Sequence, residues 1–73
     1  MPEARIVRRI ADRLCAQGAI TRKQRRHIVD RLPHHGAELS HQDLEQVLAG
    51  LPSHVVTKVL HLEQAGVTLA FRR

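Results

Sequence analysis

Cysteine and aromatic residues are scarce in this 73-residue sequence, which contains one cysteine, one phenylalanine and neither tryptophan nor tyrosine. A single cysteine, Cys15, excludes an internal disulfide and a zinc cluster built only from cysteines. We therefore expect a reducing, cytoplasmic setting. Because Phe71 is the one aromatic residue, isoleucine, valine, leucine and alanine must form the core, and this composition favours packed helices over a β-sandwich.

Long apolar runs are also missing from the sequence. No stretch approaches the roughly 18 apolar residues that a membrane span needs. The amino-terminal segment MPEARIVRRIADRL alternates basic and apolar residues and has no signal-peptide core. We expect a protein that is neither inserted in a membrane nor exported. A chain of this length forms one domain, residues 1–73, and buries only about 60% of the surface that its unfolded chain exposes.

Residue patterns typical of catalysis or metal binding are sparse as well. The carboxylates are few and scattered, and no glycine-rich loop suited to phosphate is present, so we expect no enzyme. His34, His35 and His41 lie in or beside a loop, whereas a zinc site needs four ligands and commonly includes thiolates. We predict neither a metal nor another cofactor. Cys15 stands beside Leu14 on the expected core side, which indicates a buried, inert thiol.

Positive charge is concentrated in the first half of the chain. Residues 1–36 contain nine arginines or lysines against three acids, whereas residues 37–71 contain only Lys58 against four acids. Arg72 and Arg73 follow, and the net charge is +5. A basic face of this kind commonly binds polyanions, nucleic acid first. The alternative is a solvated surface that keeps a small protein soluble.

Apolar residues recur at helical spacing in four segments. We predict a first helix over residues 3–17 and a second from the capping box of Thr21 and Gln24 to about residue 32. A third follows the N-cap Ser40, with Asp43 three residues on, and a fourth runs from Ser53 to residue 66. The predicted core positions are Ile6, Val7, Ile10, Ala11, Leu14, Ile28, Val29, Leu32, Leu44, Val47, Leu48, Leu51, Val55, Val59 and Leu62.

Two short segments have the pattern of strands. Val67, Leu69 and Phe71 alternate with other residues, as in a half-buried strand. Its expected partner is the extended piece 37–39, in an antiparallel pair. Together with the four helices, this order of elements is typical of a winged helix-turn-helix with a reduced wing. We therefore predict a mainly α domain with a minimal two-stranded β element.

Several local motifs follow one another between residues 12 and 67. A glycine precedes a helix start Thr-x-x-Gln-Arg, a Leu-Ser step opens the third helix, and the last helix ends Leu-Glu-x-Ala-Gly. The positions are Gly18, Thr21, Gln24, Arg25, Leu39, Ser40, Leu62, Glu63, Ala65, Gly66 and Val67. This series resembles the N-terminal domain of the ferric-uptake regulator family. The resemblance implies a DNA-binding winged helix in which Arg25 and its neighbours approach the DNA backbone.

The sequence also departs from that family. Val56 and Thr57 stand where its recognition helix usually carries a Tyr-Arg pair, which argues against base readout in the family's manner. The metal ligands and paired cysteines of the family's second domain have no counterpart. We therefore expect neither metal sensing nor dimerisation by that route.

Two sets of polar residues are the candidate DNA contacts. At the start of the second helix, where the helix dipole favours anions, the predicted phosphate ligands are Arg22, Lys23, Arg25 and Arg26. On one face of the fourth helix, the predicted contacts to base edges in a major groove are His54, Thr57, Lys58 and His61. For both sets, an ordinary solvated face is the simpler alternative.

We predict a small transcriptional regulator or accessory factor that binds double-stranded DNA. One module of this size buries only about 600 to 1,000 Å² on DNA, so tight binding would need a homodimer or a regulatory protein partner. The alternative is a protein-interaction module, an antagonist or adaptor that uses the same scaffold to bind another protein. An exposed Val56 beside Thr57 would favour that alternative.

Overall fold

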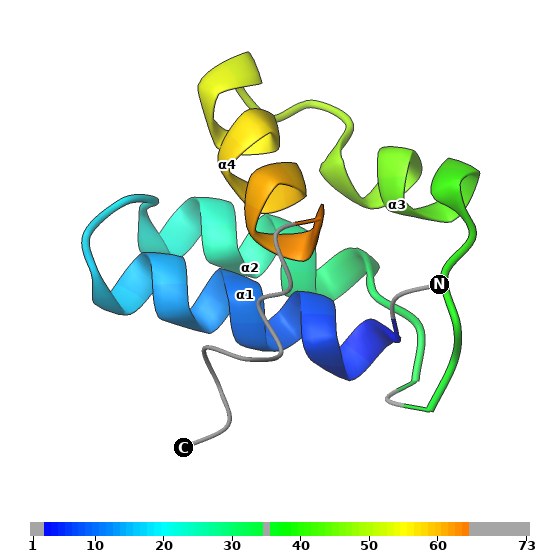
Figure 1. The fold of residues 1–73 in the computed structure, drawn as a ribbon. Coiled ribbons are helices and arrows are strands. Elements are labelled where there is room, and N and C mark those ends of the chain that lie inside the picture. Colours follow the sequence, from blue (N-terminus) through cyan, green and yellow to red (C-terminus); the bar gives the residue numbers. More distant parts are fainter. Residues whose placement is uncertain (1–2, 35, 65–73) are drawn as a thin grey trace.

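The computed structural model describes residues 3–34 and 36–64, and within them it contains four helices and an isolated β-bridge. The helices are α1 (Ala4–Ala16), α2 (Arg22–Arg31), α3 (His41–Leu48) and α4 (Ser53–Gln64). α1 and α2 lie side by side and antiparallel, and α3 and α4 lie over one side of this pair (Figure 1). The prediction of a mainly α domain of four helices is confirmed.

α1 ends where a glycine allows the chain to reverse. Gly18 has φ +78°, its N–H donates to the Cys15 carbonyl at 3.0 Å, and the Ala19 N–H donates to the Leu14 carbonyl at 2.8 Å. These bonds satisfy carbonyls that the last turn of a helix leaves without partners. Gly18 therefore ends α1 in a left-handed conformation that glycine adopts without steric cost.

Capping boxes start both α2 and α3. The Thr21 hydroxyl accepts from the Gln24 N–H at 3.0 Å, and the Gln24 side chain accepts from the Thr21 N–H at 2.9 Å. At α3 the same exchange joins Ser40 and Asp43, at 3.0 and 3.1 Å. Each box satisfies two N–H groups that a helix start would leave unpaired. The box of Thr21 and Gln24 and the N-cap at Ser40 were predicted from the sequence.

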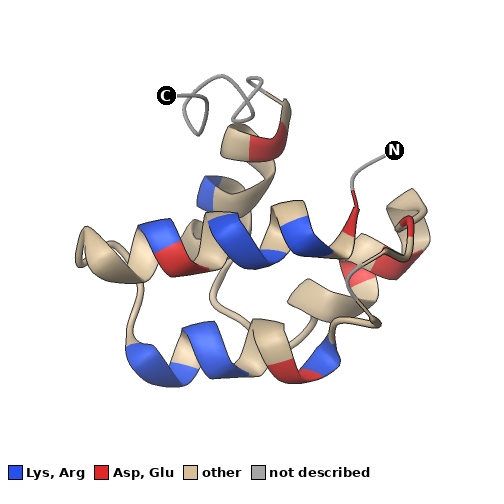
Figure 2. Ribbon diagram, turned by 90° about the horizontal axis from the view of Figure 1, so that it is seen from below, with Lys and Arg blue, Asp and Glu red and all other residues tan. Residues whose placement is uncertain are grey.

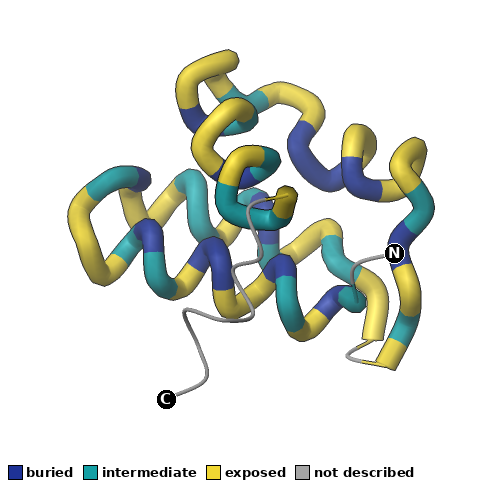
Figure 3. The backbone as a smooth tube through the Cα atoms, viewed as in Figure 1, coloured by how far each residue is buried: buried dark blue, intermediate teal, exposed yellow. Residues whose placement is uncertain are grey.

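The core lies between the α1–α2 pair and the two later helices (Figure 3). Leu62, predicted to be buried, is half-buried because it lies in the last turn of α4, at the margin of the core. Ile6, Val29, Leu32 and Leu51 are likewise half-buried. The buried core residues on the helices are Ala4, Val7, Ile10, Ala11, Leu14, Ile28, Leu44, Val47, Leu48, Val55 and Val59, and the connecting segments add Ile20 and Leu39.

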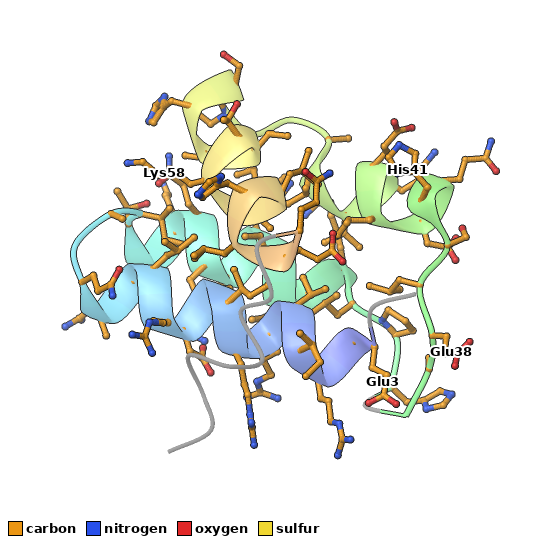
Figure 4. The ribbon with its side chains drawn as sticks, viewed as in Figure 1. Glu3, Glu38, His41 and Lys58 are labelled. Atoms are coloured by element: carbon orange, nitrogen blue, oxygen red, sulfur yellow. The ribbon has the colours of Figure 1, made fainter. Side chains whose placement is uncertain are left out.

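The predicted strand 37–39 pairs with the start of the chain in the described part of the structure. Glu38 forms an antiparallel bridge with Glu3, and the Ala4 N–H donates to the Ala37 carbonyl at 2.9 Å (Figure 4). The first N–H groups of α1 have no acceptor within the helix, so an extended neighbour supplies one. The other half of the predicted pair, residues 67–71, lies outside the described residues.

Candidate nucleic-acid interface

Three of the four predicted phosphate ligands are exposed at the start of α2. Arg22, Lys23 and Arg26 lie within its first five residues. Among the described residues none of the three forms an ion pair. The capping box uses the backbone N–H groups of Thr21 and Gln24, and the amino-terminal end of the helix dipole adds to the positive field of these side chains. This end of α2 therefore presents three cations to solvent.

The fourth predicted ligand, Arg25, is already bound to a carboxylate. Its Nη1 donates to Oδ1 of Asp12 on α1 at 3.1 Å. The Arg25 side chain is 34% exposed and that of Asp12 is 51% exposed. Arg25 therefore differs from the other three cations, because its guanidinium joins α2 to α1.

α1 contributes further basic residues to the same pair of helices. Arginines occur along α1 as well as α2, whereas α3 contains acids and no lysine or arginine (Figure 2). At the first turn of α1, Arg5 Nε donates to the Glu3 carboxylate at 2.7 Å. The positive charge that the sequence concentrates in its first half therefore lies mainly on the α1–α2 pair, and α3 on the other side of the core is acidic.

The second predicted set lies on α4 and is exposed throughout. His54, Thr57, Lys58 and His61 are all accessible to solvent. Lys58 projects from the side of α4 opposite α3 (Figure 4). α1 packs against both α2 and α4, so the two predicted sets stand on separate helices that share one neighbour.

A shallow groove of about 380 Å³ separates α3 from α4. Its apolar lining comes from both helices and from the turn between them, and Thr57 also lines it. Val56 is half-buried, so it is neither in the core nor fully exposed. The apolar residues of the lining are Leu48, Ala49, Leu51, Val56 and Leu60.

His27 is a structural residue that sequence reasoning did not identify. Its Nε2 lies 2.7 Å from the carbonyl oxygen of Ala49, the residue that caps the end of α3, and so it donates to that carbonyl. The bond ties α2 to the turn that leads into α4. A histidine in a helix gives no local signal for such a contact, because its partner is 22 residues away.

The histidine-rich loop does not assemble a metal site in the described part of the chain. No group of three or more histidine, cysteine, aspartate or glutamate residues there could hold an ion. His34 and His41 are exposed, His41 pairs with Glu45 at 3.1 Å, and His35 lies outside the described residues. Cys15, predicted to be buried, is half-buried against the core.

None of the helices in the described ranges combines the length and the apolar character that crossing a membrane requires. Comparisons with protein-family models, curated proteins and solved structures found no match to this chain. The resemblance to the ferric-uptake regulator family therefore stays a prediction from the sequence motifs.

Proposed function

We propose that this domain binds double-stranded DNA as a small transcriptional regulator or accessory factor with a winged-helix-type architecture. The basic start of α2 contacts phosphates and holds the domain on the duplex. The polar face of α4 enters the major groove and supplies the sequence preference. The proposal rests on one observation above all. Arg22, Lys23 and Arg26 are exposed together at a helix start and form no ion pair among the described residues.

The arrangement suits phosphate chemistry for a simple reason. Three cations and the positive end of a helix dipole act on the same side of α2, so their fields add where a phosphate would sit. Phosphate contacts give affinity that falls with salt, because each one releases a counterion from the DNA. α4 offers donors and acceptors but a single lysine, Lys58, so it adds little charge.

Fluorescence anisotropy with labelled duplex DNA at several salt concentrations tests the proposal. Three phosphate contacts predict a log–log salt slope of about −3. Replacing Arg22 and Arg26 with alanine should reduce the slope to about −1 and weaken all DNA sequences alike. The matched control replaces Arg5 and Arg31, which already bond the Glu3 carboxylate and the His27 carbonyl, so an equal charge is lost away from the proposed contacts.

Replacing Thr57 and Lys58 should act differently. It should lower discrimination between a preferred and a scrambled site while changing the slope by no more than about 1. An equal loss of slope in the Arg5 and Arg31 control would show that net charge, rather than the start of α2, governs binding. Absence of DNA binding at about 50 mM salt, even by an enforced dimer, would contradict the proposal.

A second candidate function is protein binding through the groove between α3 and α4. The observation in its favour is the apolar lining, to which Leu51, Val56 and Leu60 contribute half-buried side chains. An exposed apolar surface in a groove can serve as a contact surface between proteins. This function becomes the preferred one if the DNA-binding experiment fails.

A further inference from the structure

Asp12 lies among the basic residues of the α1–α2 pair and is bound to one of them. Its carboxylate accepts from the Arg25 guanidinium at 3.1 Å, across the contact between the two helices. On α1 itself, Arg8 and Arg9 stand four and three residues before Asp12, on the same side of the helix. An acid thus occupies the layer that carries most of the positive charge.

A carboxylate and a phosphate compete for the same guanidinium. Arginine has N–H donors and no acceptor, and it binds both anions through the same planar edge. A phosphate that uses the edge facing Asp12 must therefore displace that carboxylate. Asp12 also repels an approaching phosphate, because both are negative.

We propose that Asp12 limits the affinity of this domain for DNA by occupying Arg25. This inference rests on the proposed function and assigns a role to a residue that contacts no DNA itself. In the native chain Arg22, Lys23 and Arg26 provide the phosphate contacts of α2, whereas Arg25 stays paired with Asp12 and contacts no phosphate. Removal of the Asp12 charge releases Arg25 as a fourth contact.

The experiment replaces Asp12 with asparagine and compares salt-dependent DNA binding with the native chain. Asp30→Asn is the matched control, because Asp30 is exposed on α2, forms no ion pair among the described residues and carries the same charge. Asp12→Asn should steepen the salt slope by about 1 beyond the control. Its affinity at about 50 mM salt should exceed that of the control by up to about fivefold, the range in which exposed ion pairs contribute.

The double variant Asp12→Asn, Arg25→Ala identifies the residue that is released. It should return the slope to about the native value, because the fourth contact is then missing. Melting curves by circular dichroism confirm that each variant is folded at the temperature of the measurement.

Two outcomes would overturn the inference that Asp12 limits DNA affinity. Equal gains in Asp12→Asn and Asp30→Asn would overturn the inference, because net charge alone would then explain them. Weaker binding by Asp12→Asn than by its control would also overturn it and would show that Asp12 orients Arg25 toward phosphate. In both cases the flatter slope of the Arg22 and Arg26 variant would still stand, so failure of this inference is distinguishable from failure of DNA binding.

Discussion

At the scale of single residues, two glycines share a positive φ but have different surroundings. Gly18 has φ +78° and Gly50 has φ +89°, a region that other residues enter at a cost. A Cβ added at Gly18 would meet nothing within 4 Å, whereas one at Gly50 would lie 3.3 Å from Cε1 of His27. The His27 ring is held there by its bond to Ala49, so moving it aside to make room for a Cβ strains that bond.

Alanine at the two glycines should therefore have unequal effects. Gly18→Ala should lower the free energy of unfolding by about 1 kcal/mol, from backbone strain alone. Gly50→Ala should cost more, roughly 2 to 3 kcal/mol, because the contact with His27 adds to the strain. Urea denaturation measures both, with Gly36→Ala as a control outside the positive-φ region. Equal costs at Gly18 and Gly50 would show that His27 adjusts freely.

At the scale of elements, α2 and α3 depend on their amino-terminal caps. α2 is ten residues long and contains a single buried residue, Ile28, fewer than α1, α3 or α4. An isolated helix of this length is marginal in water. The capping box of Thr21 and Gln24 therefore matters more for α2 than a cap would for a well-buried helix.

Thr21→Ala should lower the free energy of unfolding by about 1 kcal/mol, because the Gln24 N–H loses its acceptor. For a domain of this size, that corresponds to a fall of about 4 to 8 °C in the melting temperature. Thr57→Ala on the exposed face of α4 is the matched control and should change the melting temperature by far less. A Thr21→Ala melt within a degree of the native one would show that Thr21 does not cap α2 in solution.

At the scale of the whole molecule, one core joins all four helices. Ile10 of α1, Ile28 of α2, Leu44 of α3 and Val59 of α4 belong to the same buried cluster. No helix can detach from the core without exposing the apolar faces of its neighbours. Small domains of this kind therefore unfold in one step. A total stability of roughly 4 to 11 kcal/mol is expected for 73 residues, from about 0.05 to 0.15 kcal/mol per residue.

Ile28→Ala should remove about 2 to 5 kcal/mol of that stability, because Ile28 is fully buried within the cluster. The matched control, Ile6→Ala, deletes the same atoms at a half-buried site and should cost less. Circular dichroism and methyl NMR signals from α1 and α4 should report the same melting midpoint in both variants. Different midpoints for the two helices would contradict a single cooperative core.

The four helices, the starts of α2 and α3 and the end of α1 were predictable from the sequence because the signals are local. The Thr21–Gln24 and Ser40–Asp43 boxes join residues three positions apart, and Gly18 ends α1 through bonds to residues within a turn or so of it. Periodicity also identified most of the core, since residues on one face of a helix recur every three or four positions. The exposure of the α4 set followed from the same periodicity.

The contacts between distant residues depended on the tertiary structure. Asp12 and Arg25 are 13 residues apart, His27 and Ala49 are 22 apart, and Glu3 meets Glu38 across most of the first half of the chain. Spacing along one helix says which way a side chain faces but not which helix it meets there. Arg25 was therefore grouped with Arg22, Lys23 and Arg26 by its place on α2, and only the packing of α2 against α1 distinguished it, by placing a carboxylate within reach of its guanidinium.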